Sequence, residues 1–237
     1  MRILTLGSER EVARASARMI AAAATANPEL VLGLPTGRTV LPFYDALADL
    51  HRAGDLDLRH ARSFNLDELL LPPGHSKSFR AYMEAHAWGR IGLDPAGCSI
   101  PDSTAADPAL ECARYEAELA AAGGLDVAVL GVGADGHVAY NLPGTQRAEA
   151  HVVELPDSVA ESLGIAPAKR PLRALTLGLG ALVSARRVML LATTAEKARA
   201  VRALVDGPED SRWPCTALRE HPELDVLLTP EVGGERA

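Results

Sequence analysis

The sequence predicts an α/β fold: one Rossmann-like domain over residues 1–237, with a mainly parallel sheet covered by helices on both faces. Apolar runs of strand length alternate with segments whose apolar residues recur at helical spacing. The 237 residues, 48% of them hydrophobic, suffice for one large core. The chain shows no repeat, low-complexity linker or change of composition that would divide it. Alternating strands and helices are typical of a parallel sheet between two helical layers.

The elements are predicted in order from these patterns. A capping box at Ser8–Glu11 opens a helix that runs to about Ala26. The next elements are a strand at 29–34, a turn at 35–39, a helix from about Val40 to Leu50, a strand ending near Phe64, an irregular segment from Asp67 to Lys77, and helices at 78–90 and 107–122. Later strands are predicted at 125–130, 150–155, 172–177, 187–192 and 224–228, with a second capping box, Thr193–Glu196, opening a helix through Asp206.

Charge and composition exclude several classes of function. The net charge is −7 and there is no basic tract, so we expect no nucleic-acid partner. No apolar stretch approaches the ~20 residues that a membrane span needs, and the N-terminus has no apolar region of a signal peptide. The three cysteines lack metal-site spacing. These features predict a cytoplasmic protein without a membrane partner, and they leave a homo-oligomer open.

The most informative segment is a glycine-rich turn that follows the predicted strand at 125–130. Gly131, Gly133 and Gly136 allow a sharp turn and a close approach to a ligand. The turn carries Asp135 and His137 at the carboxyl end of a strand, where open α/β sheets bind their ligands. A turn that served only the fold would need the glycines, but it would not need the acid and the imidazole.

The same glycines match the fingerprint of dinucleotide-binding proteins, Gly-x-Gly-x-x-Gly. That fingerprint should open a helix and precede an acid about 20 residues later. Here Pro143 and Gly144 would stop a helix almost at once. The sequence therefore disfavours a nicotinamide cofactor.

Two other junctions indicate an anion site. Thr36, Gly37, Arg38 and Thr39 form a turn at a predicted helix N-terminus, where free amides and the helix dipole favour an anion. An ordinary turn capped by threonine explains the pattern equally well. Lys197 lies in the first turn of a later helix, where its charge opposes the dipole, so it could meet an anion there. The alternative is a solvated lysine in a helix of mixed charge.

A pair of acids, Asp67 and Glu68, follows the strand that ends near Phe64. Paired acids in a loop are usually solvated. A carboxylate at the end of a strand can instead act as a general base, if a substrate carbon lies against it.

Taken together, these motifs resemble the glucosamine-6-phosphate deaminase/isomerase family, whose wider superfamily includes 6-phosphogluconolactonase. The resemblance runs almost end to end, through residues 32–39, 64–68, 71–78, 131–141, 174–178, 195–198, 213–218 and 221–222. The deaminase branch is favoured by Phe-Asn-Leu-Asp-Glu at 64–68 and by Tyr140-Asn141. The lactonase branch usually has Asp-Glu-Arg where this chain has Asp-Glu-Leu, and Gly-Gly-Ser-Thr-Pro at the first turn.

The resemblance implies an aldose–ketose isomerisation coupled to loss of ammonia from an amino-sugar phosphate. It assigns Asp67 as the base that takes the C2 proton, and His137 with Asp135 as the group that helps to open the sugar ring. It places the phosphate at residues 36–39 and Lys197. It implies no metal and no organic cofactor.

The chain departs from this family at three places. Leu142 stands where deaminases usually have a glutamate that works with the histidine, so the relay is incomplete unless Asp135 or another acid replaces it. Arg38 replaces a glycine of the phosphate loop. The segment between Pro143 and Leu172 is short, and the arginines that contact the phosphate cannot be placed by a motif; the candidates are Arg147, Lys169, Arg170 and Arg173.

Three functions therefore remain open. The first is an amino-sugar-phosphate deaminase/isomerase acting on glucosamine 6-phosphate or a close epimer. The second is a sugar-phosphate lactone hydrolase that uses His137 to activate water. The third is a sugar-phosphate-binding regulator without catalysis, suggested by the missing acid at Leu142.

Overall fold

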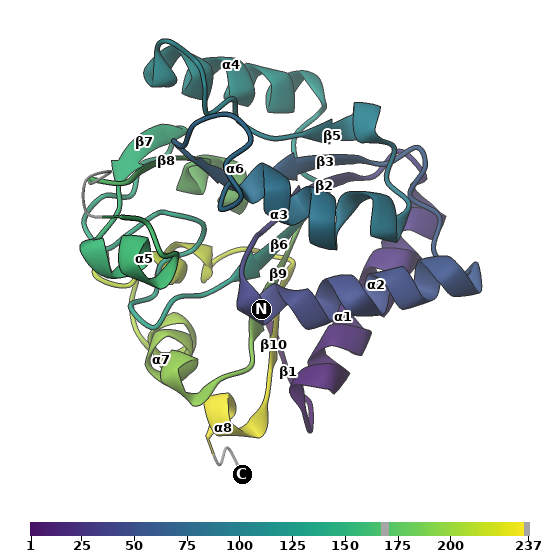
Figure 1. Cartoon of the computed structure of the whole chain (residues 1–237). Helices are drawn as coiled ribbons and strands as arrows, with labels where there is room; N and C mark the ends of the chain where they lie inside the picture. Colours follow the sequence, from purple (N-terminus) through teal and green to yellow (C-terminus); the bar gives the residue numbers. More distant parts are fainter. Residues whose placement is uncertain (167–170, 235–237) are drawn as a thin grey trace.

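The main sheet consists of seven strands, all parallel, in the computed structural model of the chain, which describes residues 1–166 and 171–234 (Figure 1). In spatial order they are β1 (Arg2–Thr5), β10 (Leu224–Leu228), β9 (Arg187–Ala192), β6 (Val127–Gly131), β2 (Val31–Leu34), β3 (Arg62–Asn65) and β5 (Cys98–Ser99). The central strands are buried along nearly their whole length, as their continuous apolar runs predict.

A second, antiparallel sheet of three strands lies beside the main one. Its order is β4 (Asp67–Leu69), β8 (Arg173–Thr176) and β7 (His151–Glu154). The prediction of an irregular segment from Asp67 was therefore wrong over 67–69. Two adjacent acids in three residues gave no strand pattern, yet Asp67 pairs directly with Thr176 of β8.

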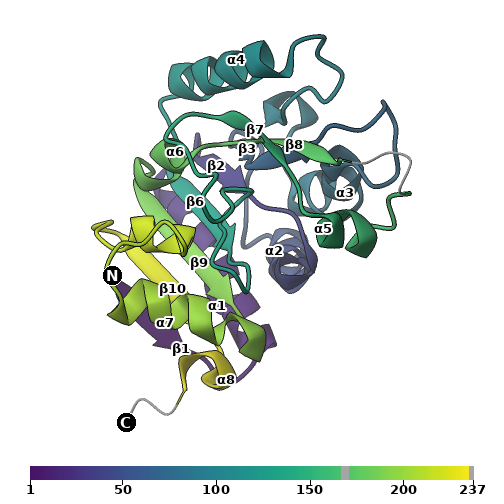
Figure 2. The ribbon, with the colours of Figure 1, turned by 90° about the vertical axis from the view of Figure 1, so that its left-hand side faces the viewer.

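Helices cover both faces of the main sheet, which confirms the predicted fold class (Figure 2). One face packs against α1 (Glu9–Ala26), α2 (Leu41–Ala53), α3 (Phe79–His86) and α5 (Asp157–Ser162). The other packs against α4 (Pro108–Ala121), α6 (Leu179–Val183), α7 (Ala198–Asp206) and α8 (Pro230–Gly233). Alternate residues of each strand enter the two cores: in β6, Val127 and Val129 face the first core, while Ala128 and Leu130 face the second.

The two predicted capping boxes have different outcomes. Ser8 accepts a hydrogen bond from the amide of Glu11 at the start of α1, as predicted. The box predicted at Thr193 was wrong, because the Thr193 hydroxyl donates to the carboxylate of Glu9 instead of capping a helix. A 3₁₀ turn, Ala195–Lys197, leads into α7 there.

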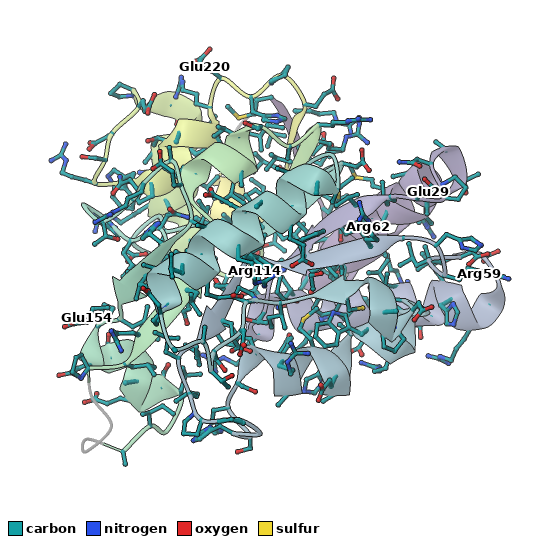
Figure 3. The ribbon with its side chains drawn as sticks, turned by 90° about the horizontal axis from the view of Figure 1, so that it is seen from above. Glu29, Arg59, Arg62, Arg114, Glu154 and Glu220 are labelled. Carbon is teal, nitrogen blue, oxygen red and sulfur yellow. The ribbon has the colours of Figure 1, made fainter. Side chains whose placement is uncertain are left out.

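Seen from above, α4 lies in front of the strands, with Arg114 beside it (Figure 3). Arg114 forms ion pairs with Glu111 and Glu118 on the same helix. Within the described part of the chain, no helix combines the length and the apolar character needed to cross a membrane.

The sheet order creates a crevice between the ends of β2 and β6. These strands are neighbours, but the chain leaves β2 towards β3 on one side, while β9 lies beyond β6 on the other. Such a switch in topology opens a crevice at the carboxyl ends of the strands, where ligands of α/β proteins bind. The turn after β2 and the glycine-rich turn after β6 both face this crevice.

Candidate active site

A cavity of 300 Å³ lies at this crevice. Six of the residues predicted from the sequence line it: Thr36, Gly37, Thr39, Asp67, His137 and Lys197. The structure does not bring the other two to its wall. Arg38 is exposed on the outside of its turn, and Asp135 stands behind His137. A larger groove of 740 Å³, between α1 and α2, contains none of the predicted site residues.

The turn after β2 forms the first wall. Residues Arg38–Val40 make one 3₁₀ turn, which continues directly into α2 at Leu41. Gly37 precedes it with φ +119°, a conformation that favours glycine. No side chain caps this turn. The geometry is that of a helix N-terminus with amides available to an anion.

Lys197 forms the facing wall. Its side chain is buried, and Nζ donates a hydrogen bond to the carbonyl of Val132 at 2.6 Å. The interpretation of Lys197 as a solvated surface residue was therefore wrong. Burial lowers the pKa of Lys197, while Glu196 and Asp135 oppose this shift. An ammonium has three donors, so an anion in the cavity could accept from those that Val132 does not use.

The acid pair lies at the point where the chain passes from the main sheet into the small one. Asp67 begins β4, and both Asp67 and Glu68 are buried. Burial, and then the charge of Glu68, raise the pKa of Asp67 to about 8. Asp67 faces the cavity, and its carboxylate is therefore an unusually basic group beside the ligand space.

Glu68 does not line the cavity, and its side chain is hydrogen-bonded to backbone amides. Its carboxylate accepts hydrogen bonds from the amides of Leu69, Phe79 and Arg80 at 2.7, 2.7 and 2.8 Å. Two of these amides belong to the first turn of α3, which therefore has Glu68 as well as Ser78 at its N-terminus. The interpretation of the pair as ordinary solvated acids was wrong for both residues.

The glycine-rich turn presents His137 to the cavity. Nδ1 of His137 lies 2.6 Å from Oδ1 of Asp135, so this carboxylate orients the ring and leaves Nε2 for a ligand. The side chains of both residues fold over Gly133, where a Cβ would collide with them. Gly136 has φ +83° and packs against Trp213. The residues directly after this turn form no helix, whereas a dinucleotide-binding fingerprint opens one.

Leu142 is part of the hydrophobic core and 7% exposed. The carboxylate that contacts His137 is Asp135, from within the same turn. Asn141 holds the segment in place by donating to the carbonyls of Val138 and Leu177. The imidazole is thus positioned without an acid at position 142.

The structure does not bring Arg147 or Arg173 into the cavity. Arg147 is exposed and lines a neighbouring cavity of 390 Å³, and Arg173 is exposed on β8. Lys169 and Arg170 lie outside the described residues.

The sequence analysis missed two aromatic residues of the cavity wall. Phe79 and Tyr140 both line it and stack on each other, with centroids 6.0 Å apart and planes 19° apart. Tyr140 also lies 6.3 Å from the His137 ring. Ser78, a good N-cap, indicates where α3 begins, but no local signal indicates that Phe79 reaches the glycine-rich turn. Among the described residues, no three His, Cys, Asp or Glu side chains gather as metal ligands would.

The fold and this cavity define an α/β protein with an uncapped turn at a helix N-terminus, a buried carboxylate and an oriented histidine at the switch point of its sheet. Residues 8–227 match the family described as glucosamine-6-phosphate isomerases/6-phosphogluconolactonase, and the chain belongs to this family.

Relatives with known names support this assignment. The glucosamine-6-phosphate deaminase of Halothermothrix orenii is 33% identical over 98% of both chains. That of Pseudarthrobacter chlorophenolicus is 38% identical, over 96% of this chain and 90% of the relative. A solved structure of a monomeric glucosamine-6-phosphate deaminase matches with a TM-score of 0.91 and 32% identity, over 98% of both chains. The 6-phosphogluconolactonase of Trypanosoma cruzi, 20% identical with a TM-score of 0.82 over 100% of this chain and 97% of its own, shares the fold.

Proposed function

We propose that this chain is an amino-sugar-phosphate deaminase/isomerase, which converts glucosamine 6-phosphate or a close epimer to a ketose 6-phosphate and ammonia. One observation carries the proposal. A buried carboxylate, Asp67, shares a cavity with an oriented histidine, His137, and with an anion-binding loop. Relatives at 33–38% identity over nearly the whole chain carry this activity in their names.

His137 acts first in the proposed mechanism. Its Nδ1 donates to Asp135, so Nε2 can take the proton of the C1 hydroxyl and pass it to the ring oxygen of the bound sugar. This transfer opens the pyranose and produces the free aldehyde. Asp135 stabilises the imidazolium that forms when His137 holds a proton.

Asp67 acts on the open chain. A carbon next to a carbonyl gives up its proton only to a well-placed base. Asp67 lines the cavity, and its raised pKa makes its carboxylate a stronger base than an ordinary aspartate. The carboxylate takes the proton from C2 and returns it to C1, while the aldehyde oxygen gains the proton that the amine gives up, which leaves an imine at C2. Water adds to this imine, and ammonia leaves as the ketose forms.

The phosphate is bound far from these carbons. Thr36, Gly37, Thr39 and Lys197 line the same cavity, so the amides of this turn and the ammonium of Lys197 would hold the phosphate together. Binding energy from this remote group positions C2 against Asp67.

Leu142 favours a second candidate, a sugar-phosphate lactone hydrolase. His137, oriented by Asp135, could activate a water molecule. The glutamate that deaminases usually have at position 142 is replaced by a buried leucine. This reaction would not need Asp67 as a base, which separates the two functions experimentally.

The test is ammonia release from glucosamine 6-phosphate and from galactosamine 6-phosphate, measured beside hydrolysis of 6-phosphogluconolactone. We expect ammonia from one amino sugar, and we expect it to disappear in Asp67→Asn. Asp57→Asn is the matched control, since Asp57 is an exposed acid paired with Arg59 away from the cavity. Rapid lactone hydrolysis without ammonia release would instead identify the hydrolase, and inactivity on all three would support the non-catalytic binder.

We also propose a cytoplasmic location. Cys98, Cys112 and Cys215 are all free thiols in the described structure, as in a reducing compartment.

A further inference from the structure

The loop proposed to bind phosphate is held at one point by a side chain that does not line the cavity. The hydroxyl of Tyr82, on α3, donates a hydrogen bond of 2.7 Å to the carbonyl of Gly37. Gly37 has φ +119°, and within the described part of the chain no heavy atom other than those of its chain neighbours lies within 4 Å of the position that a Cβ would occupy. Side-chain packing therefore gives the loop no support at this residue, and the hydrogen bond fixes the orientation of its peptide group.

The start of the loop is fixed in a similar way. The hydroxyl of Tyr44, fully buried on α2, donates to the carbonyl of Pro35 at 2.6 Å. The rings of Tyr44 and Tyr82 meet edge to face, with centroids 6.4 Å apart. Two phenol hydroxyls thus bind the carbonyls at 35 and 37, and in a trans peptide this points the amides of Thr36 and Arg38 in the opposite direction. The loop amides are then free to face the cavity.

The N-terminus of α3 is hydrogen-bonded to the acid pair. Glu68, the residue after Asp67, accepts from the amides of Phe79 and Arg80 in the first turn of the helix. Tyr82 follows one turn later. A short hydrogen-bonded path therefore runs from Asp67 through Glu68 and α3 to Tyr82 and Gly37.

This path joins the two ends of the substrate site. The loop would hold the phosphate, and Asp67 would meet C2 of the same molecule. We propose that Tyr82 is a positioning residue, which through α3 fixes the loop Thr36–Thr39 relative to Asp67. The inference rests on the proposed function, because it assigns residues 36–39 to the phosphate. A loop that drifts would spend less time in the arrangement that binds phosphate, so the sugar phosphate would bind less tightly.

The experiment compares Tyr82→Phe with Tyr115→Phe. Both changes remove one hydroxyl that donates to a backbone carbonyl, but Tyr115 binds Asn65 and Ser99 and has no contact with the loop. Inorganic phosphate is the probe, first as a competitive inhibitor of ammonia release and second as a ligand that raises the melting temperature.

We expect Tyr82→Phe to raise the inhibition constant of phosphate and the KM of the amino sugar together, by roughly three- to tenfold, as loss of one hydrogen bond implies. The kcat should change by less than about threefold, since the catalytic groups remain. Tyr115→Phe should leave the inhibition constant of phosphate at its wild-type value. An equal rise in both variants would indicate general loosening and overturn the inference.

The thermal measurement distinguishes this inference from the proposed function, because it needs no activity. If phosphate stabilises the wild type and Tyr82→Phe to the same extent, Tyr82 has no positioning role and the inference fails alone. If phosphate does not stabilise the wild type, the phosphate loop itself is wrongly assigned, and both fail together.

Discussion

Two pairs of polar side chains flank the same cavity in opposite environments. Asp67 and Glu68 are buried, and burial raises the pKa of both carboxyls. Asp135 and His137 are partly exposed, with side-chain exposures of 50% and 32%, and the hydrogen bond from His137 lowers the pKa of Asp135. One pair thus contains an acid made more basic, and the other an acid kept ionised.

The difference matches the two proton transfers of the proposed reaction. Removing a proton from carbon is difficult, and a carboxylate deprived of water is a stronger base for it. Moving a proton at a ring oxygen is easier, and an exposed imidazole held by a carboxylate suffices. Burial therefore sets the strength of the base on one side, and a hydrogen bond sets the orientation of the ring on the other.

Asp67→Asn should have the largest effect. An amide cannot accept the C2 proton, so we expect kcat for ammonia release to fall by about 10²–10⁴-fold. Proton exchange at C2, followed by NMR in deuterated water, should disappear with it. Residual exchange at the wild-type rate would show that another group is the base.

The same variant should be more stable than the wild type in alkaline solution. Burial and the charge of Glu68 raise the pKa of Asp67 from 3.8, the ordinary value of an aspartate, to about 8, so the folded state holds a proton that the unfolded state has lost between these values. The wild type therefore loses stability as pH rises through this range, and the asparagine variant does not. At pH 9 the melting temperature of Asp67→Asn should exceed that of the wild type, and the difference between the two melting temperatures should shrink as the pH falls towards 3.

Asp135→Asn tests the exposed pair and should have a smaller effect. The variant removes the charge that steadies a protonated His137 but retains a hydrogen-bonding group, so we expect kcat to fall by about ten- to a hundredfold. Proton exchange at C1 of the ketose 6-phosphate in the presence of ammonia, which needs no opening of the aldose ring, should be less affected. Equal losses in both assays would place Asp135 outside ring opening.

Lys197→Met should act mainly on binding. Methionine fills the buried space but carries no charge, so the KM of the amino-sugar phosphate should rise by about tenfold with a smaller change in kcat. Arg199→Met on α7 is the control, because Arg199 lies over the Trp213 ring and does not line the cavity. An unchanged KM would remove Lys197 from the phosphate site.

The contrast between the two pairs also explains what sequence analysis could predict. Five of the seven strands of the main sheet follow from apolar runs, whereas the short edge strands β1 and β5 were not predicted. The glycine-rich turn follows from local spacing, because Gly133, Asp135 and His137 lie within five residues. The burial of Asp67 could not be predicted in this way. It depends on pairing with Thr176, more than 100 residues away, and on amides of α3 that satisfy Glu68.

Position 142 is a second place where the sequence does not predict the packing. The sequence reveals that an acid is missing there, but not that Leu142 packs into the core. Long-range packing therefore decides which polar side chains face the ligand, whereas local pattern decides where the turns lie.

Glu68→Gln should have the smallest effect on rate, and it tests whether charge contributes to the basicity of Asp67. Removing the charge of Glu68 makes ionised Asp67 less unfavourable, so the pKa of Asp67 should fall from about 8. The acidic limb of the pH profile of kcat/KM should then move to lower pH, by about half to one unit.

The other groups near Asp67, the phenols of Tyr44, Tyr115 and Tyr140, remain unchanged in Glu68→Gln. The glutamine amide faces backbone donors, so stability should fall by about 1–2 kcal/mol. Asp57→Asn controls for loss of an acid elsewhere. A profile that keeps its wild-type midpoint while stability falls would show that burial alone makes Asp67 basic, and that Glu68 serves only to cap α3.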